Sequence, residues 1–550
     1  MRIIVIGAVA GGTSAAMKAR RNDEKAEIVI YDKGKHISYS GCGMPFYLSG
    51  EVEKSSELTP RESGYFELAH EIYIKTEHEV EKIDPKTKTI LVKDLKTGEK
   101  FTDQYDKLVI ATGARARDLL VEGATLPHVF SLRTIEDMFK IDDYLKTHKV
   151  ENVTVIGSGY VGVELVDSFT KRGMKVTLLE KMEQIIPNLD EEMAQYVRSY
   201  LETIGIKIFT GVDVKKITPT SITFHQGEKE HESPSELVLV AIGVKPNTEI
   251  ASEAGIVLGD SKAIKVNEYL ETNIKDIYAA GDCMESWHMI DKKPLYLPLG
   301  STANKTGRIV GDNITGGKVI FKGVLGTAIF KVFDLSIGQT GKTEKQALKE
   351  GLDYLVITHT KPDRPHFMGG QDMIIKALSL KDGTIIGAQI VGHEGVDKRI
   401  DIIATTMTLK GKASDLEDMD LAYSPPFATA RDPINYTGMI LENALKKNRK
   451  LISAKELLRP GQTKRVILDI RSPIAFLQSH LDEAINIPQM YVRDNLTKLD
   501  KDAEIIVCCL SGWTSNAVQN ILLNEGFKDV KNLAGGYVSI ANHLRLLKNK

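Results

Sequence analysis

The segment Val153-Thr-Val-Ile-Gly-Ser-Gly-Tyr-Val-Gly162 decides the fold of this 550-residue chain. An apolar run of strand length leads into the pattern Gly-x-Gly-x-x-Gly, followed by a helical stretch and a strand over 175–179 that ends at Glu180. Glycines in such a turn let the backbone approach a pyrophosphate, whose charge then lies at a helix N-terminus. Glu180 lies 18 residues after Gly162 (180 − 162), where it can bind ribose hydroxyls. The segment therefore predicts a βαβ dinucleotide-binding unit.

A second, less complete unit opens the chain. Residues 2–6 form an apolar run that leads into Gly7-Ala-Val-Ala-Gly-Gly12, a helical stretch and a strand that ends at Asp32. Asp32 lies 20 residues after Gly12 (32 − 12), but Val9 stands where the pattern has its middle glycine. By itself this pattern fits a tight structural turn as well as it fits a nucleotide site. Two such units in one chain nevertheless predict two dinucleotide sites.

The acidic residues at the strand ends indicate which nucleotides bind. Glu180 favours a free ribose 2′-hydroxyl and would repel a 2′-phosphate, so NADH is expected, and the neighbouring Lys181 leaves NADPH as the alternative. The segment 277–283 places Asp282 after a short buried strand, where its carboxylate can meet a ribityl hydroxyl. Cys283 beside it is expected to be a small buried residue.

A single cysteine follows the first unit, in Ser38-Tyr-Ser-Gly-Cys-Gly-Met-Pro-Phe-Tyr-Leu-Ser-Gly50. We expect the Cys42 thiol to lie at the start of a helix where a bound flavin would stack, and to act as a redox thiol against FAD. A helix N-terminus or a nearby cation can lower a thiol pKa from about 8.5 to about 3.5–7.5, which would activate Cys42. The next cysteine is Cys283, so a second sulfur has to come from an external thiol, or Cys42 is oxidised to a sulfenate.

Composition excludes several classes of function. The chain is 42% hydrophobic and 27% charged, and its formal net charge of −2 provides no long-range field for nucleic acid or an anionic membrane. No apolar run approaches the ~20 residues that span a bilayer, and the opening strand does not fit a secretion signal. Four cysteines do not form a disulfide framework. We expect a reduced, cytoplasmic enzyme of several domains, with no metal site and no nucleic-acid or membrane partner.

The chain resembles the flavoprotein disulfide reductases with two dinucleotide-binding domains. The resemblance depends on the two nucleotide units, the turn Ala111-Thr-Gly113, the Ala-Gly-Asp segment and the single Cys42 taken together. Residues 1 to about 445 are most similar to the branch of coenzyme A-disulfide reductases and NADH-dependent persulfide reductases. The resemblance implies an α/β fold with two Rossmann-like, glutathione-reductase-like domains, an α+β dimerisation domain and a homodimer. The expected bounds are 1–115 and 245–321 for FAD binding, 116–244 for NAD(P)H binding and 322–445 for dimerisation.

The same resemblance implies ligand-binding residues. FAD is expected at Gly7, Ala8, Gly11, Gly12, Asp32, Lys33, Val80, Ala111, Thr112, Gly113, Gly281, Asp282 and Ala303. NAD(P)H is expected at Gly157, Gly159, Tyr160, Val161, Gly162, Glu164, Glu180, Lys181 and Gly243. Coenzyme A, as bound thiol or substrate, is expected at Ser14, Lys18, Arg21, Ser38, Tyr39, Asn304, Arg308 and Arg431.

Three further positions bear on the chemistry that the resemblance implies. The segment Leu421-Ala-Tyr-Ser-Pro-Pro-Phe427 is similar to the Tyr-Ala-Pro-Pro segment of that branch. The Tyr of the branch reaches the thiol site of the other subunit. Tyr423 is therefore expected to protonate or hydrogen-bond a departing thiolate. The chain departs from the branch at His366-Phe367, where the branch carries Tyr-Tyr. Peroxidase and oxidase relatives carry a His in the first Gly-rich loop, and Ala10 in its place argues against peroxide or water-forming oxygen chemistry.

The C-terminal part has its own pattern. A basic segment, 446–464, is expected to be a linker, and the α/β pattern over 465–550 resembles a rhodanese domain. The motif Cys-x-Ser-Gly-x-x-Ser implies that Cys509 is the sulfur-carrying nucleophile, on a loop whose N–H groups stabilise a thiolate or persulfide. The family often has Arg at the sixth loop position, where this chain has Thr514. Without that charge, thiosulfate is expected to bind poorly and a persulfide is the expected donor.

These observations lead to one principal hypothesis. It is an NADH-dependent, FAD-containing reductase of coenzyme A persulfide, polysulfide or coenzyme A disulfide, joined to a rhodanese sulfur relay. Two alternatives stay open at this point: an NADH oxidase, and a flavin-linked sulfur carrier or redox sensor.

Overall fold

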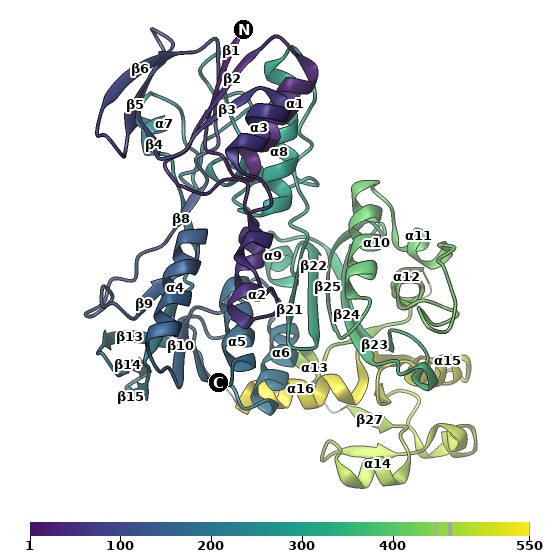
Figure 1. The fold of residues 1–550 in the computed structure, drawn as a ribbon. Helices are drawn as coiled ribbons and strands as arrows, with labels where there is room; N and C mark the ends of the chain where they lie inside the picture. Colours follow the sequence, from purple (N-terminus) through teal and green to yellow (C-terminus); the bar gives the residue numbers. More distant parts are fainter. Residues whose placement is uncertain (447, 460–464, 549–550) are drawn as a thin grey trace. The chain divides into compact units, whose positions relative to one another are not determined.

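The computed structural model describes residues 1–446, 448–459 and 465–548 (Figure 1). The chain forms two compact units. Unit 1 contains Met1–Lys181 and Gly211–Val324, and unit 2 contains Met182–Thr210 and Leu325–Lys550. Within the described ranges, none of the helices has both the length and the hydropathy of a membrane-crossing segment.

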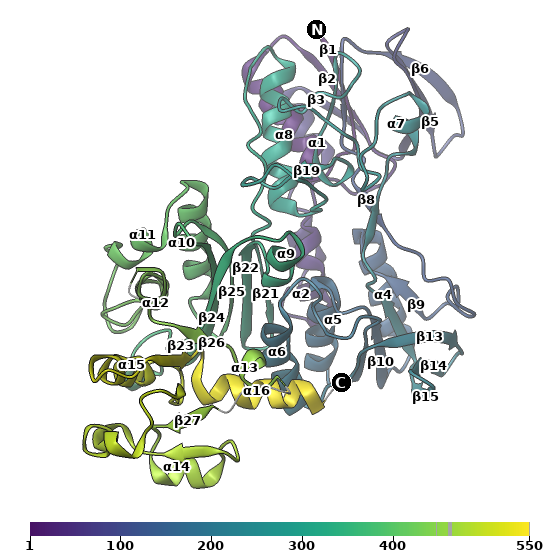
Figure 2. The same ribbon diagram turned by 180° about the vertical axis from the view of Figure 1, so that it is seen from behind.

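The first sheet of unit 1 is fully parallel and has the strand order β18-β7-β1-β2-β3. Its central strand is completely apolar over Ile3–Ile6 and buried, as expected for a parallel strand covered on both faces. Helices α1 (Ala10–Asn22) and α8 (Gly300–Ile314) lie side by side along it, as both ribbon views show (Figure 2). The strands are β1 (Arg2–Ile6), β2 (Glu27–Tyr31), β3 (Ile72–Lys75), β7 (Lys107–Ile110) and β18 (Ile277–Ala279).

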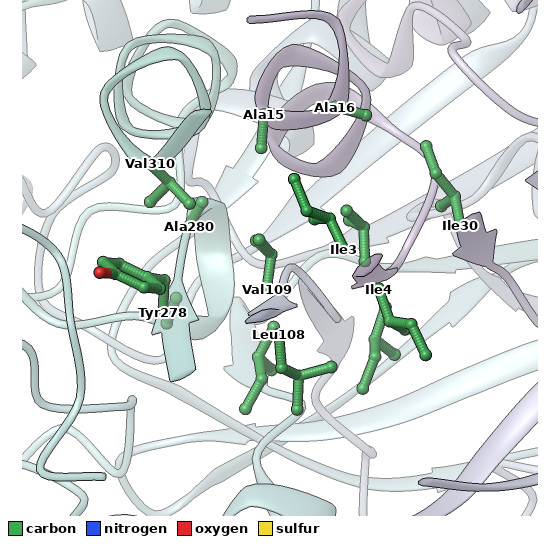
Figure 3. Close-up of a cluster of buried hydrophobic side chains, with 14 of the residues drawn as sticks. Ile3, Ile4, Ala15, Ala16, Ile30, Leu108, Val109, Tyr278, Ala280 and Val310 are labelled. Atoms are coloured by element: carbon green, nitrogen blue, oxygen red, sulfur yellow. The ribbon is translucent and has the colours of Figure 1, made fainter. Parts of the chain in front are cut away.

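Small residues allow α1 and α8 to approach this closely. A Cβ atom on Gly307 would lie 2.3 Å from the carbonyl oxygen of Gly11, and one on Gly311 would lie 2.5 Å from that of Ala15. Figure 3 shows Ala15 of α1 pointing towards the sheet, close to Val109. The apolar strands and these small helical residues form the core of the first sheet.

The second nucleotide unit repeats this arrangement in unit 1. Strands β11 (Lys175–Leu179), β10 (Asn152–Ile156), β16 (Leu237–Val240) and β9 (Val129–Ser131) are parallel neighbours in that order. Helix α5 (Tyr160–Lys171) follows β10, and α4 (Ile135–Thr147) begins with a capping box at Thr134 and Asp137. Unit 1 also contains two antiparallel three-stranded sheets. One is formed by β4 (His78–Asp84), β5 (Thr89–Asp94) and β6 (Lys100–Gln104), and the other by β13 (Val212–Ile217), β14 (Ser221–Gln226) and β15 (Lys229–Pro234).

Unit 2 contains a five-stranded antiparallel sheet with the order β21-β22-β25-β24-β23. Helix α10 (Val396–Thr408) packs on β22 and β25, and α12 (Pro433–Lys446) packs on β23 and on α11 (Ala413–Asp418). The strands are β21 (Ala328–Val332), β22 (Leu335–Gly341), β23 (Tyr354–Pro362), β24 (Asp372–Leu380) and β25 (Ile385–Gly392).

Residues 182–210, expected in the NAD(P)H-binding domain, belong to unit 2. The physical reason is a buried ion cluster. Lys376 is 1% exposed, and its Nζ lies 3.0 Å from Asp190 and 2.6 Å from Glu344 and also contacts Glu192. Burial disfavours the ammonium, but the three carboxylates outweigh it and raise the pKa of Lys376. The segment also carries α6 (Glu191–Thr203) and β12 (Lys207–Phe209).

The C-terminal sheet of unit 2 is parallel, with the order β26-β30-β29-β27-β28. The expected linker 446–464 is shorter than predicted, because Leu451–Ile452 form β26, which pairs with β30, and Ala454–Leu457 form α13. Residues 447 and 460–464 of that segment lie outside the described residues. The remaining elements are β27 (Val466–Asp469), α14 (Pro473–Gln478), β28 (Ala484–Asn486), β29 (Glu504–Cys508), α15 (Thr514–Asn524), β30 (Asp529–Leu533) and α16 (Gly536–Lys548).

Candidate functional sites

The first Gly-rich turn has the geometry of a dinucleotide cradle. Gly7 has φ +107°, and a Cβ atom on Gly12 would lie 1.8 Å from the carbonyl oxygen of Gly7, so glycine is required at both positions. The Asp32 carboxylate accepts hydrogen bonds from the backbone N–H of Ala8 (2.6 Å) and of Gly34 (2.7 Å). These contacts hold an acid at the end of β2, beside the turn, and the residues present fit FAD.

The second turn has the same construction. Gly157 has φ +98°, and a Cβ atom on Gly162 would lie 2.0 Å from the carbonyl oxygen of Gly157. The buried Glu180 carboxylate accepts from the backbone N–H of Ser158 (2.8 Å) and from its hydroxyl (2.6 Å). The acid is therefore fixed at the end of β11, beside the N-terminus of α5, where the residues present fit NAD(P)H.

The other residues expected at the two nucleotides all lie in unit 1. Asp282 and Gly281 form the short 3₁₀ helix Gly281–Cys283, and Gly281 donates its N–H to Thr306 Oγ1 (3.1 Å). Thr112 donates its hydroxyl to the carbonyl of Asn247 (2.6 Å). The remaining positions are Gly11, Gly159, Tyr160 and Val161 in or before α1 and α5, Lys33 and Lys181 after β2 and β11, Val80 in β4, Ala111 and Gly113 after β7, Gly243 after β16, and Ala303 in α8.

Cys42 lies in the 3₁₀ turn Gly41–Gly43, immediately before the six-residue helix α2 (Met44–Ser49), and is exposed. The expected lowering of its pKa does not occur in this chain. Desolvation by the surrounding protein atoms and the Glu164 carboxyl both raise the pKa of Cys42, and Arg133 only partly opposes them. The physical reason is chiefly the desolvation of the thiol, to which the negative charge of Glu164 adds.

Glu164 and Arg133 define the charge around Cys42. Burial, with a further contribution from Asp167, raises the pKa of Glu164 to about 7. Helix α5, which carries Glu164, packs against α2. Arg133 forms an ion pair with Asp282 (2.6 Å). Near neutral pH, a carboxyl able to hold or release a proton therefore lies in the vicinity of the thiol.

The residues expected to contact coenzyme A divide between the units. In unit 1, the Ser14 hydroxyl donates to Asn304 Oδ1 (2.8 Å), which joins α1 and α8. Lys18 is paired with Asp312 (3.0 Å), so its charge is partly neutralised. Arg21 and Arg308 are exposed on the same two helices. Ser38 has φ +48°, and burial raises the pKa of the neighbouring Tyr39 to about 12. Arg431 lies in unit 2.

Tyr423 lies in unit 2 and is half exposed. It lines a cavity of about 430 Å³ together with Arg364, Lys398, Arg399 and Phe427. Two aromatic residues are more exposed than Tyr423: Phe427 at 74%, and Phe367, which stands where the branch carries Tyr, at 80%.

The loop after β29 surrounds the sulfur of Cys509. The backbone N–H of Gly512 donates to Cys509 Sγ (3.1 Å), and Ser515 Oγ lies 3.2 Å from it. Burial of the sulfur raises its pKa, but hydrogen bonds from Ser515, Thr514 and the backbone N–H groups of Ser515 and Ser511 reverse this and lower the pKa of Cys509. Burial and Asp469 instead raise the pKa of Cys508.

Sequence reasoning missed several residues at these sites. Asn532 accepts from the Ser515 hydroxyl (2.6 Å) and donates to the carbonyl of Gly512 (3.0 Å), which fixes the loop. Ser515 is the last residue of the motif and could have been found from it. Arg133 and Asn532 carry no local sequence signal, because their partners are distant in the chain. Cys283 is completely buried, as expected.

Comparison with known proteins identifies the chain's relationships. The model of the family "Pyridine nucleotide-disulphide oxidoreductase" matches residues 1–300, and the dimerisation-domain model of the same family matches residues 327–433. A rhodanese-like domain model matches residues 453–543.

Relatives and solved structures agree with these matches. An "NADH oxidase" of Methanocaldococcus jannaschii is 34% identical over 81% of this chain and 99% of its own length. An "NAD(P)H coenzyme A polysulfide/persulfide reductase" of Pyrococcus horikoshii is 32% identical over 80% of this chain and 98% of its own. The crystal structure of reduced Bacillus anthracis CoADR-RHD is 32% identical, covers 99% of this chain and 98% of its own, and gives a TM-score of 0.96.

These matches confirm the fold class, the rhodanese assignment and the enzyme class that the sequence predicted. The chain therefore belongs to the pyridine nucleotide-disulphide oxidoreductase family, whose members are FAD- and NAD(P)H-dependent enzymes, and it carries a rhodanese-like domain after its dimerisation domain.

Proposed function

We propose that this enzyme reduces coenzyme A persulfide, polysulfide or coenzyme A disulfide with NAD(P)H, and that it acts as a homodimer with Cys42 as its redox thiol. The observation that carries the proposal is the exposed Cys42 thiol in the FAD-binding part of unit 1, where the other cysteine, Cys283, is buried. A thiol without a neighbouring cysteine needs its second sulfur from the substrate. The names of the relatives and the dimerisation-domain match support this proposal.

The chain's own residues have separate roles in the proposed reaction. FAD, when bound, supplies electron transfer from NAD(P)H to a disulfide. Cys42 holds the substrate sulfur as a mixed disulfide, and Glu164 can hold or release a proton beside it near neutral pH because its pKa is about 7. We propose that Tyr423 of the partner subunit donates a hydrogen bond to the departing thiolate. Ser14, Asn304 and the basic residues of α1 and α8 are proposed to hold coenzyme A.

Replacement of Cys42 tests the proposal. In Cys42→Ser, NADH should still reduce the bound flavin in anaerobic stopped-flow experiments, because both nucleotide sites are intact. Turnover with coenzyme A persulfide and coenzyme A disulfide should be lost. Unchanged turnover would contradict the proposal.

A second replacement tests the sulfur relay. Cys509→Ser should abolish sulfur transfer from a persulfide donor and spare the reduction of coenzyme A disulfide, because the disulfide carries no sulfane sulfur. Equal loss of both activities would mean that the C-terminal domain is structural, or that the two sites cannot be separated.

An NADH oxidase is the second candidate, favoured by the name of the Methanocaldococcus relative. It predicts oxygen uptake that is stoichiometric with NADH and indifferent to added thiols. Ala10 in the first Gly-rich loop disfavours it, because no acid/base residue stands there.

A further inference from the structure

A lysine from the antiparallel sheet of unit 2 lies at the Cys509 loop. Lys361, in β23, places its Nζ 3.7 Å from the ring centroid of Trp513, which belongs to the loop, and 3.8 Å from that of Tyr436 in α12. The two rings are steeply inclined to one another, with centroids 6.3 Å apart and an interplanar angle of 75°. Two aromatic faces within 6 Å of one ammonium group fix its position by cation–π attraction.

The positive charge at this place is offset only in part, by the Asp372 carboxylate, which forms no ion pair with Lys361. In the described parts of the chain, neither Lys361 nor the neighbouring Arg431 forms an ion pair with a carboxylate. The Arg431 guanidinium lies 5.7 Å from the Tyr436 ring centroid, on the same aromatic side chain. Two cations that share one ring without a carboxylate partner create a site for an anion.

The space between these groups is a cavity of about 100 Å³. Lys361, Arg431 and Tyr436 line it from the antiparallel sheet and α12, and Ser511, Gly512 and Trp513 line it from the Cys509 loop. The cavity is thus built by two domains, and the loop contributes the residues that surround the sulfur.

The charges in the cavity influence one another. Burial and the repulsion of Arg431 lower the pKa of Lys361 to about 8, while the negative charges of Asp372 and Cys509 favour its ammonium form. Lys361 therefore remains largely charged at neutral pH and can give up its proton readily. Cys509 is thus one of the charges that act on the Lys361 ammonium group.

We propose that Lys361, assisted by Arg431, supplies from the dimerisation domain the positive charge that the Cys509–Thr514 loop lacks, and that this composite site takes an anionic sulfane-sulfur donor. The proposal goes beyond the reductase activity, because loading of sulfur onto Cys509 needs neither NAD(P)H nor Cys42. It revises the expectation that Thr514 in the sixth loop position excludes thiosulfate.

The transfer step balances without a further reactant. The Cys509 thiolate attacks the outer sulfur of thiosulfate, the Cys509–sulfur bond forms, the sulfur–sulfur bond of the donor breaks, and sulfite leaves with the electron pair. A persulfide donor reacts in the same way, with its thiolate as the leaving group. In both cases Lys361 stabilises the persulfide anion on Cys509 and the departing anion.

The first test measures the charge at Cys509 directly. In a Cys42→Ser background, alkylation by iodoacetamide is followed as a function of pH, and fragmentation mass spectrometry assigns it to Cys509. All three remaining cysteines are buried, but hydrogen bonds lower the pKa of Cys509, whereas burial raises the pKa of Cys283 and of Cys508. Lys361→Gln should raise the apparent pKa of Cys509, and Lys361→Arg should restore it. Lys349→Gln is the matched control, because this lysine is exposed at the end of α9 (Glu344–Lys349).

The second test measures sulfur transfer to cyanide, with thiosulfate and coenzyme A persulfide as separate donors. Lys361→Gln should lower kcat/KM about tenfold or more, as expected for loss of a contact with a charged group, mainly through KM. A decrease with both donors identifies the shared anionic sulfur as the recognised group, and a decrease with thiosulfate alone restricts the site to small anions.

One result overturns the proposal: Lys361→Gln leaves both the alkylation pKa of Cys509 and the KM for both donors unchanged. Failure of Lys361→Arg to restore either quantity would also overturn it, when the same substitution in the chain with Cys42 intact retains reduction of coenzyme A disulfide. That retained reduction separates failure here from failure of the reductase proposal, which depends on Cys42.

Discussion

The backbone N–H of Gly512 donates to Sγ of Cys509 across 3.1 Å, one of several contacts in this loop that distinguish Cys509 from the adjacent Cys508. Cys509 faces a loop of hydrogen-bond donors that lower its pKa, whereas the Cys508 thiol is buried near Asp469, which raises its pKa. A thiolate is the reactive form of cysteine, so the loop selects Cys509 as the nucleophile.

The hydrogen bond between Ser515 and Cys509 should contribute measurably to this selection. Ser515→Ala removes a hydroxyl whose Oγ lies 3.2 Å from the sulfur and which lowers the pKa of Cys509, so this pKa is expected to rise and alkylation at neutral pH to slow. The pH dependence of alkylation in a Cys42→Ser background measures the change. Ser479→Ala, an exposed serine of the same domain, should have no effect. An unchanged profile in Ser515→Ala would show that backbone donors alone stabilise the thiolate.

Glu164 should control the reactivity of Cys42. As pH rises through about 7, Glu164 ionises and its negative charge disfavours the Cys42 thiolate. Glu164→Gln cannot ionise, so the apparent pKa of Cys42 should fall and alkylation should become faster above pH 7. Alkylation rates of the holoenzyme between pH 6 and about 9 provide the measurement. Equal profiles for Glu164→Gln, the wild type and the exposed control Glu253→Gln would refute this link.

Lys376 should be essential for stability. Lys376→Met leaves Asp190, Glu192 and Glu344 without their shared counter-charge, and removal of one partner from a buried ion cluster costs about 3–5 kcal/mol. The free energy of unfolding from urea denaturation should fall by this amount at pH 7. Lys349→Met at the exposed end of α9 should change it little. A loss in Lys376→Met no larger than in this control would contradict the assignment.

Tyr423 should matter for turnover and not for reduction of the flavin. Tyr423→Phe removes the hydroxyl proposed to stabilise a departing thiolate, so turnover with coenzyme A disulfide should fall by about 10²-fold or more, the range of general acid catalysis. The rate of flavin reduction by NADH in stopped-flow measurements should stay the same. Tyr65→Phe is the control, because Tyr65 is a similarly exposed tyrosine of unit 1. Normal turnover of Tyr423→Phe would remove this residue from the mechanism.

Local patterns predicted the nucleotide units closely. The apolar run expected over 2–6 is β1, Arg2–Ile6, and the strand expected over 175–179 is β11, Lys175–Leu179. This accuracy arises because glycine turns and buried parallel strands are specified by adjacent residues. The cysteine loop was predictable for the same reason, since Cys509, Gly512 and Ser515 lie within seven positions (515 − 509 + 1).

Interactions between distant positions were not predictable. The ion pair of Asp190 with Lys376 joins residues 186 positions apart (376 − 190), so no local pattern indicates that 182–210 belong to unit 2. The contact of Lys361 with Trp513 joins two domains in the same way. The lowered pKa expected for Cys42 was wrong because desolvation of the thiol, together with Glu164 on another helix, outweighs Arg133.

The ion cluster of Lys376 also limits how this protein can be divided or recombined. A cut after Val324 would leave Asp190 and Glu192 on one fragment and their ammonium partner on the other. The same mismatch would arise if the nucleotide-binding half were exchanged with that of a relative whose dimerisation half lacks a matching lysine. In such chimeras residues 182–210 have to travel with the dimerisation half, so the units of exchange differ from the order of domains along the chain.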